Sequence, residues 1–511
     1  MNPLSFSKIL LTATLLLSCQ VLVFRCNRKS NTEGEKLAKI HCSSCHQFPS
    51  PQLLPQNVWE HSTLPYMGIL LGIDTELKNL PDPLKPYSIL KAENQMVSQA
   101  DWEKIKEYYL DNSPKKLESN NKEPLAILEN LFEVEMVDTK LANSTIPNFT
   151  MVSIDTLKRQ IIAGDQSNRY IWVIDKNGKP SQIFKDQNAL SSIEYSKTKP
   201  NEMIMTFMGK TTQANQEVKG YITSNTFNTE LKTITTIQQN LDRPVSTLSV
   251  NLDQSAENEL VVSEFGFMEG GLSILKKSKN NHFTQKYLSR SPGVVKTIIV
   301  DFDGDKDLDL VTLFAQGNER IVLYKNKGNL IFEEKQILQF PPIYGSNYFE
   351  LVDINNDSKL DIVYAAGDND DFTTILKPYH GIYIFENEGN DTFKQANFFA
   401  QNGACKVLPK DYDLDGDVDL ISTSLFPDVE NRPKEGFIYF ENQKGAFIQK
   451  TLNINHLGRW AVMDAGDLDG DGDIDLVLGS HPVAKFPSGF DQSWKKGSGL
   501  VILRNKKKEP K

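Results

Sequence analysis

The stretch Asp467-Leu-Asp-Gly-Asp-Gly-Asp-Ile-Asp475 places five carboxylates in nine residues and runs directly into the apolar segment Leu476-Val-Leu-Gly479. Carboxylates this close repel one another unless a cation neutralises them. Three further segments share the acidic nonapeptide and the apolar run that follows it: DFDGDKDLDLVTL from Asp301, DINNDSKLDIVYA from Asp353 and DYDLDGDVDLIST from Asp411. The four starts are roughly 55 residues apart, which is the spacing of a repeated structural unit.

Each unit contains further strands. A second apolar run ends in Asn and a glycine turn, as in RIVLYKNKGNLIF, GIYIFENEGNDTF and GFIYFENQKGAF. A weaker copy of the unit begins at Asn251, and two decayed copies lie near Ile154 and Ile193. Four clear, one weak and two decayed copies predict an all-β seven-bladed propeller over residues 128–507, in which each blade buries its faces against its neighbours.

The acidic nonapeptides are candidate calcium sites. Alternate side chains of such a loop can point at one ion, as they do at the start of an EF-hand loop, and hard oxygen ligands select calcium. A glycine at position six permits the sharp turn in the loops from Asp411 and Asp467, whereas Lys306 and Ser358 replace it in the other two. The weak copy, with Ser255 and Ala256, is expected to have lost its metal. The predicted ligands are Asp301, Asp303, Asp305 and Asp309; Asp353, Asn355, Asp357 and Asp361; Asp411, Asp413, Asp415 and Asp419; and Asp467, Asp469, Asp471 and Asp475.

Together the loops and the strands after them resemble the FG-GAP or VCBS repeats of integrin-like propellers, clearly from Asn251 to Val477 and faintly elsewhere. The resemblance implies a propeller in which calcium holds the turns between blade strands. We favour that structural role over a catalytic one because no imidazole joins the acidic loops.

Cys42-Ser-Ser-Cys45-His46 is a second motif, near the N-terminus. In CxxCH the two thiols can add to the vinyl groups of a haem, and the adjacent imidazole can ligate the iron. The rival interpretations are half of a zinc site or a simple redox CxxC. Among the five cysteines of the chain, no second closely spaced pair follows that would complete a tetrahedral zinc site.

The residues around this motif resemble the class I c-type cytochrome domain, through GEKLAKIHCSSCHQFP and WEKIKEYYLDNSP. The resemblance covers residues 35–115 and implies a small all-α domain with covalent haem c, His46 as proximal ligand and a methionine as distal ligand. We favour Met67, because its Pro-Tyr-Met-Gly context suggests a turn that projects the side chain. Met96 and His61 remain alternatives. A capping box at Ser98 predicts a helix whose apolar face carries Trp102, Ile105, Tyr108 and Tyr109 and which Pro114 ends.

Residues 1–26 have the pattern of an export signal, with Lys8, an apolar run and then Leu16-Leu17-Ser18-Cys19. The last four residues resemble a bacterial lipobox, which implies lipidation of Cys19. An uncleaved helix from Ile9 to Phe24 is the alternative. Both predict an extracytoplasmic, membrane-anchored protein of the periplasm or cell surface, with a tether at 27–34 and a linker at 116–127. Cys26 and Cys405 have no assigned role.

The balance of 66 acidic and 56 basic residues, a net charge of -10, disfavours nucleic acid as a partner. The longest interruption of the repeat is the loop Gly367–Gly381, which brings in Asp371, Lys377 and His380. Phe426-Pro-Asp428 and His456-Leu-Gly-Arg459-Trp460 are expected on the same propeller face, where loops often carry binding. Solvated polar loops without a ligand are the alternative interpretation.

These observations favour an electron-transfer haem protein whose propeller docks a redox partner protein or a ligand. One alternative is a dehydrogenase that oxidises a small molecule such as a sugar on the propeller and passes electrons to the haem, using Asp371, Lys377 or His380. Another is a module for adhesion or carbohydrate binding. Whether the propeller is catalytic stays open, since the sequence holds no complete nucleophile triad and no dinucleotide-binding motif in its proper context.

Overall fold

The computed structural model describes residues 32–118, 123–141, 145–197, 199, 201–210, 218–227, 231–280, 282–369, 375–482 and 493–507. The chain divides into two compact units, Met1–Ser44 with Leu54–Lys115, and Cys45–Leu53 with Lys116–Lys511. The predicted export signal, with Cys19 and Cys26, lies outside the described residues. Within the described part of the chain, no helix has both the length and the apolar character that a membrane crossing needs.

The residues before the propeller are helical. They form α2 (Thr32–His41), η1 (Pro51–Leu53), α3 (Gln56–Val58), the π-helical η2 (Trp59–Thr63), α4 (Leu64–Leu70), η3 (Asp74–Lys78), η4 (Asp82–Leu90) and α5 (Gln99–Asn112). The predicted capping box at the start of α5 is confirmed, because Ser98 Oγ accepts a hydrogen bond from the Asp101 backbone N–H at 3.1 Å. The four residues predicted for its apolar face are all buried.

Helix α2 packs against α5 through its smallest side chains. Gly34 and Ala38 are buried in α2, whereas Ile40 is 56% exposed. Small residues allow the close approach of the two helices, and Ile40 lies on another side of α2. Lys104 of α5 pairs with Glu33 of α2 at 2.8 Å.

A buried carboxylate organises the helical unit. Glu76 is 1% exposed, and its oxygens accept hydrogen bonds from Trp102 Nε1 at 2.7 Å, Lys106 Nζ at 2.9 Å and Asn79 Nδ2 at 2.7 Å. Burial by itself raises the pKa of Glu76, but these three donors outweigh burial and hold the pKa below its ordinary value. Glu76 is therefore a paired charge that ties α5 to η3.

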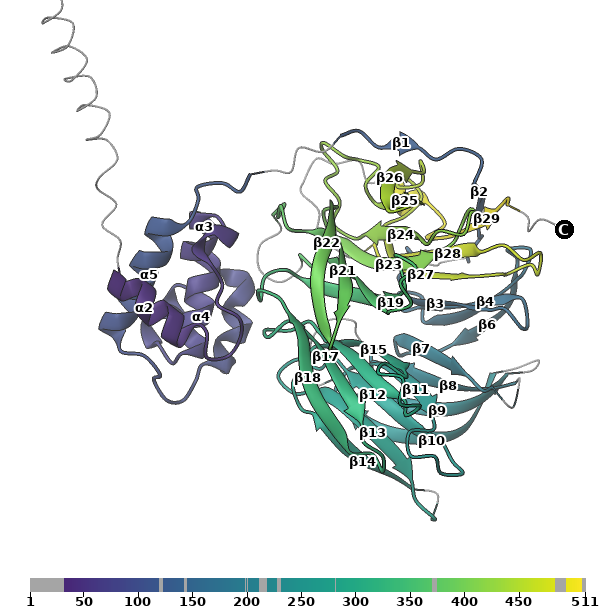
Figure 1. The fold of residues 1–511 in the computed structure, drawn as a ribbon, viewed down its shortest axis with the longest axis horizontal. Helices are drawn as coiled ribbons and strands as arrows, with labels where there is room; N and C mark the ends of the chain where they lie inside the picture. The colour runs from purple at the N-terminus through teal and green to yellow at the C-terminus, as the bar shows by residue number, and fades with distance from the viewer. Residues whose placement is uncertain are drawn as a thin grey trace, which may run out of the picture. The chain divides into compact units, whose positions relative to one another are not determined.

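The described residues of the second unit form seven sheets, each built on four antiparallel strands, which confirms the predicted seven-bladed propeller (Figure 1). Blade 1 consists of β3 (Phe149–Asp155), β4 (Gln160–Asp165), β5 (Tyr170–Asp175) and β6 (Pro180–Lys185). Blade 2 consists of β7 (Leu190–Tyr195), β8 (Glu202–Phe207), β9 (Gly220–Phe227) and β10 (Leu231–Leu241). Blade 3 consists of β11 (Pro244–Val250), β12 (Glu259–Glu264), β13 (Gly271–Lys277) and β14 (Phe283–Ser289). The decayed and weak copies of the repeat are therefore blades 1 to 3.

The four clear copies are blades 4 to 7. Blade 4 consists of β15 (Val294–Val300), β16 (Asp309–Phe314), β17 (Arg320–Asn326) and β18 (Phe332–Gln339). Blade 5 consists of β19 (Ser346–Val352), β20 (Asp361–Ala366), β21 (Gly381–Gly389) and β22 (Thr392–Ala400). Blade 6 consists of β23 (Ala404–Lys410), β24 (Asp419–Ser424), β25 (Phe437–Gln443) and β26 (Ala446–Thr451). Blade 7 consists of β27 (Trp460–Gly466), β28 (Asp475–Ser480) and β29 (Leu500–Asn505), completed by β2 (Phe132–Met136).

Strand β2 closes the ring. It pairs antiparallel with β29, from Phe132 opposite Asn505 to Met136 opposite Val501, so the start and the end of the propeller share blade 7 (Figure 1). Strand β1 (Ala126–Ile127) pairs parallel with β26 and adds a fifth strand to blade 6, within the segment expected to be a linker.

Burial explains the apolar runs of the repeat. The second strands of blades 3 to 7, which are β12, β16, β20, β24 and β28, are buried at every residue. A strand covered on both faces reads as a continuous apolar run rather than as an alternating one. The first strands of neighbouring blades contact one another around the closed ring, and the acidic loops join the first strand to the second in blades 4 to 7.

Candidate metal loops and haem-attachment segment

Each acidic loop is held in shape by its first carboxylate. Asp301 Oδ1 accepts a hydrogen bond from the Gly304 N–H at 2.9 Å, and Oδ2 accepts one from the Lys306 N–H at 3.1 Å. Position six has a positive φ in all four loops: 78° at Lys306, 66° at Ser358, 95° at Gly416 and 99° at Gly472. The sharp turn predicted at position six is thus confirmed, and Lys306 and Ser358 adopt it although glycine does so at lower cost.

The ninth residue of each loop is buried and bonded to the backbone on both sides. Asp309 Oδ2 accepts from the Phe302 N–H at 3.0 Å, and Oδ1 accepts from the Asn326 N–H at 2.8 Å. The same pair of bonds recurs at Asp361, Asp419 and Asp475, from the second residue of each loop and from the Asn near the end of the third strand. The ninth carboxylate therefore fastens the loop to the third strand.

The strand-ending asparagines complete this arrangement. Asn326 Nδ2 donates to Leu308 O at 3.3 Å within blade 4 and to Leu252 O at 2.8 Å in blade 3. Asn505 likewise donates to Tyr412 O of the preceding blade at 2.8 Å. The sequence pattern marks these asparagines as turn residues, but no local signal indicates that they bond neighbouring blades.

Three of the four loops bring carboxylate oxygens to within 4.8 Å of one another. The groups are Asp301, Asp303 and Asp309; Asp411, Asp413 and Asp419; and Asp467, Asp469 and Asp471. In the described part of the chain the loop from Asp353 forms no such group. Its Asp357 instead pairs with Lys359 at 2.9 Å, so a lysine already neutralises part of that loop.

Two buried oxygens support a cation in the last two loops. Asp413 Oδ1 and Asp473 Oδ2 are buried and, among the described residues, have no hydrogen-bond donor. Burial and then the neighbouring Asp471 and Asp475 raise the pKa of Asp473 to about 7. Carboxylate oxygens with this environment fit a hard divalent cation, which supplies the missing positive charge.

In the weak copy of the repeat, in blade 3, a lysine side chain pairs with the acidic loop, whereas three of the four clear copies group carboxylates that could hold a metal. Asp253 pairs with Lys276 of β13, and Glu259 takes the ninth position, accepting the Leu252 N–H at 3.0 Å. The loop thus keeps its fastening to the blade, while Lys276 supplies the positive charge.

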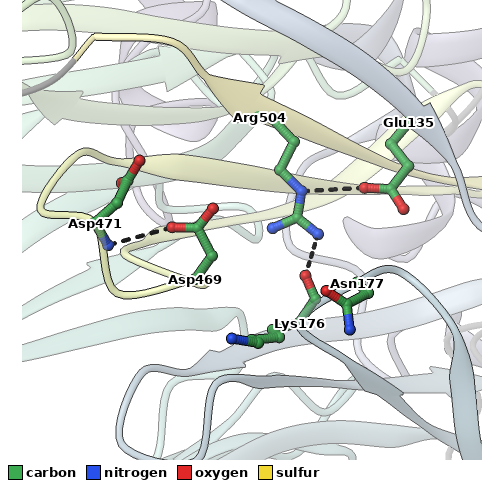
Figure 2. Close-up of a pocket in the computed structure, with 6 residues that line it drawn as sticks. All are labelled: Glu135, Lys176, Asn177, Asp469, Asp471 and Arg504. Atoms are coloured by element: carbon green, nitrogen blue, oxygen red, sulfur yellow. Dashed lines mark hydrogen bonds and ion pairs between the residues drawn. The ribbon is translucent and has the colours of Figure 1, made fainter.

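An open cleft of about 540 Å³ lies beside the last acidic loop (Figure 2). Blade 7 contributes Asp469 and Asp471 from the loop, Arg504 from β29 and Glu135 from β2, and blade 1 contributes Lys176 and Asn177 from the turn between β5 and β6. Arg504 holds the walls together: Nε pairs with Glu135 at 3.0 Å, and Nη2 donates to Lys176 O. Asp475 lies 3.6 Å from Arg504 Nη1.

The CxxCH segment begins where α2 ends. The Cys42 N–H bonds to Ala38 O at 2.8 Å and so continues the helix, and Cys42 is a free thiol whose pKa burial raises to about 11. Cys45 is exposed. His46 Nδ1 lies 2.9 Å from Gln47 O, the contact by which a backbone carbonyl fixes the tautomer and leaves Nε2 to bind a metal. Two thiols and an imidazole are the residue types that covalent haem attachment uses.

The candidate distal ligands occupy different settings. Met67 lies inside helix α4 and is partly buried, so the turn predicted around it is wrong: Pro65 occupies the first turn of a helix, where proline is tolerated. Met96 is 54% exposed, and His61, in η2, is exposed. Of the three, Met67 is the most buried.

On the face opposite the acidic loops, the structure brings two of the expected residues together. The Arg459 guanidinium carbon lies 5.6 Å from the Phe426 ring centroid and 5.7 Å from that of Trp494. The His481 N–H donates to Arg459 O at 2.8 Å. Burial, and then the charge of Arg459, lower the pKa of His481 to about 4. Trp494 and His481 were not predicted from the sequence. The signal for His481 is its position directly after β28, at the end of a buried strand.

The loop Gly367–Gly381 is described only in part, since Asp370 and Asp371 lie outside the described residues. His380 is 1% exposed, and the Tyr379 ring stacks on Tyr344 at 4.8 Å. His456 is exposed on its own loop. The imidazole of His380 is thus part of the packed blade and is not presented to solvent.

A charged cluster that the sequence pattern does not predict lies between the first strands of blades 4 to 7. Lys296 Nζ lies 2.5 Å from Glu350 Oε1 and 2.7 Å from Tyr348 OH, and Lys406 Nζ stands 4.8 Å from the Tyr348 ring centroid. Burial lowers the pKa of Lys296 to about 8 against the opposing effect of Glu350, and burial raises the pKa of Asp464. These residues lie on the first strands of different blades, so only an alignment of the four strand sequences could have predicted that they meet.

Cys405, on β23, is a half-buried thiol whose pKa burial raises to about 11. Its Sγ lies 3.3 Å from Thr423 Oγ1 and 3.3 Å from Trp460 O. A neutral thiol with these contacts serves packing rather than reactivity.

Comparison with known proteins supports the repeat. Residues 301–364 and 411–478 match the FG-GAP-like repeat family, and these two segments contain all four acidic loops. No curated protein matches the chain. Among solved structures, the crystal structure of the N-terminal domain of Nup159 matches 76% of this chain and 99% of its own, with 10% identity and a TM-score of 0.42.

Proposed function

We propose that this chain is an exported, membrane-anchored electron-transfer haem protein whose calcium-binding propeller docks a redox partner or a ligand. The observation that carries the proposal is Cys42-Ser-Ser-Cys45-His46, which follows α2, a helix packed on α5. A CxxCH after the first helix of a small helical unit is the arrangement of c-type cytochromes that the sequence resembles.

The haem would be held by thioether bonds to Cys42 and Cys45, with His46 Nε2 and the Met67 thioether as axial ligands. Bound there, it would supply one-electron chemistry, and a thioether ligand raises the reduction potential. The contact of His46 Nδ1 with Gln47 O supports the proximal assignment, because a fixed tautomer keeps Nε2 available.

Calcium in this proposal is a structural ion. The loops from Asp301, Asp411 and Asp467 would bind it through the grouped carboxylates. Asp413 Oδ1, which is buried and has no hydrogen-bond donor within the described ranges, supports such an ion. A propeller with FG-GAP repeats suits ligand or partner docking, because its loops are presented on a rigid ring. Lipidation at Cys19 would place the protein on a membrane surface.

The test is the oxidised and reduced absorption spectrum of the full chain, expressed in a host that matures c-type cytochromes. Met67→Ala is expected to lose the methionine-to-iron charge-transfer band, and the matched variant Met96→Ala is expected to keep it. Loss of the band only in Met96→Ala would move the distal ligand to that residue. A preparation without haem would overturn the proposal.

The alternative of a dehydrogenase on the propeller face has less support. It would use Asp371, Lys377 or His380. His380 is buried in blade 5, Lys377 is partly exposed, and Asp371 lies outside the described residues. Reduction of the haem by a sugar that disappears in His380→Ala would revive it.

A further inference from the structure

The first strands of the blades form the inner circle of the propeller. They contact one another around the closed ring, and in blades 3 to 7 the second strands outside them are buried at every residue. Several side chains of the first strands nevertheless keep partial exposure, with Lys296 at 19% and Glu350 at 22%. Because the second strands cover their outer side, solvent reaches these side chains from the axis of the ring.

Three side chains of this inner circle occupy the same position in successive blades. Lys296 of β15, Tyr348 of β19 and Lys406 of β23 each follow the bulge near the start of the first strand. The Lys296 ammonium lies 3.9 Å from the Tyr348 ring centroid, and the Lys406 ammonium lies 4.8 Å from it. One phenol ring is therefore in contact with two amino groups.

The two lysines differ in their partners. Lys296 Nζ lies 2.5 Å from Glu350 Oε1 and 2.7 Å from Tyr348 OH. Lys406 Nζ makes no hydrogen bond or ion pair with any described residue, and the carboxylates of Glu350 and Asp464 act on it only at longer range. Lys406 is therefore the amine of this cluster that no acceptor holds.

The surroundings of Lys406 favour the neutral amine. Burial lowers the pKa of Lys406, and the charges of Lys296 and Lys406 repel each other. Asp464 and Glu350 oppose this effect without cancelling it. Glu350 is already paired with Lys296, and burial raises the pKa of Asp464. A lysine that is desolvated and lies near a second cation is an activated nucleophile.

We propose that Lys406 is a covalent binding site for small aldehydes that enter along the axis of the propeller. Its neutral Nζ would attack the carbonyl carbon and form a carbon–nitrogen bond. The carbonyl oxygen would then leave as water with the two amine protons, and a Schiff base would remain. The amine itself selects this ligand class, because Schiff bases form between a neutral lysine and a carbonyl group. The inference depends on neither haem nor calcium.

The test is reaction of the full chain with acetaldehyde at neutral pH in the presence of sodium cyanoborohydride. The hydride reduces each Schiff base to a stable ethyl-lysine, which peptide mass spectrometry quantifies at each position over time. The reference is Lys232, which is exposed on β10 and makes no hydrogen bond or ion pair with any described residue. Lys406 is expected to react at least about fivefold faster, because a lowered pKa increases the fraction of neutral amine.

Two variants separate this chemistry from simple accessibility. Lys296→Met removes the neighbouring cation and leaves Glu350 unpaired, and both changes favour the protonated form of Lys406, so its rate should fall about threefold or more. Lys232→Met is the matched control and should leave the Lys406 rate unchanged. The comparison of Lys406 with Lys232 uses the wild-type protein, so it holds even if Lys296→Met fails to fold.

Two results would overturn the proposal. A wild-type rate at Lys406 equal to or below that at Lys232 would mean that the amine is protonated or that aldehydes do not reach it. Equal Lys406 rates in the wild type and in folded Lys296→Met would mean that the paired lysines do not activate the site.

Discussion

The bond between Asn326 and the preceding blade predicts a difference between two otherwise similar variants. Asn326 and Asn442 are 1% and 2% exposed, and each donates to a carbonyl of its own loop and accepts from a glycine N–H of its own turn. Only Asn326, of these two, also donates to a neighbouring blade, at Leu252 O. The pair therefore isolates one hydrogen bond between blades.

The magnitude follows from the groups left unsatisfied. Asn442→Ala removes two hydrogen bonds and is expected to cost about 2 kcal/mol, whereas Asn326→Ala removes three and is expected to cost about 3–4 kcal/mol. The assay is urea unfolding followed by tryptophan fluorescence, once in EDTA and once in calcium. The difference of about 1–2 kcal/mol should persist in EDTA, because the bond needs no metal.

Two results would refute this reasoning. Equal losses in the two variants would mean that the bond to Leu252 contributes nothing to the free energy of unfolding. A dependence of the difference on calcium would mean that the asparagine acts through the metal loop and not through the blade contact.

Three further predictions concern pH, the helical unit and the metal. Burial lowers the pKa of His481 to about 4, so the buried neutral imidazole costs nothing above pH 6.5 and destabilises the folded state as the pH falls toward 4. The expected loss in the free energy of unfolding is about 3 kcal/mol. Thermal melts against pH should show this loss in the wild type and in the control His282→Gln, which changes an exposed residue, but not in His481→Gln. Glu76→Ala leaves the Trp102 indole and the Asn79 amide without their acceptor and removes one of the two carboxylates that pair with Lys106. It should destabilise the helical unit by about 2–3 kcal/mol in near-UV circular dichroism melts, and an unchanged melt would contradict it. Calcium at about 100 times its dissociation constant should stabilise the propeller by about 2.7 kcal/mol per site, and Asp413→Ala should lose one site in a calcium titration.

The blades were predictable because the repeat is local. Each acidic nonapeptide and the buried strand after it lie within one blade, so the pattern survives in sequence even where Lys306 or Ser358 replaces the turn glycine. Seven copies then imply seven blades, because each blade needs neighbours to cover its faces. The closure by β2 was not predictable, since Phe132–Met136 lacks the repeat pattern and pairs with residues at the far end of the chain.

The loop chemistry was predicted only in outline. The spacing identifies the acidic residues but cannot separate Asp419, buried and bonded to two backbone N–H groups, from Asp415, which is exposed on the loop. Which of the two carboxylates is buried depends on the position of the third strand, whose Asn442 N–H bonds Asp419. Lysines such as Lys296 likewise read as solvated when taken singly, and only the closed ring of first strands places them against Tyr348 and Glu350.

In the helical unit, too, local features were predictable and those that depend on long-range packing were not. A capping box is local, and α5 begins where it indicated. The conformation around Met67 depends on longer-range packing, since Gly68 lies against Glu76 and Trp102, and a Cβ there would stand 2.5 Å from Glu76 Cγ. A helix, rather than the expected turn, brings these residues together.

The most direct test of the account is the intact mass of the denatured protein purified from a host that matures c-type cytochromes. Covalent haem would add the mass of one haem to the wild type, and Cys42→Ser with Cys45→Ser would lose it while the propeller still binds calcium. A wild-type mass without haem would contradict the central claim and leave a calcium-binding propeller whose CxxC pair serves another chemistry.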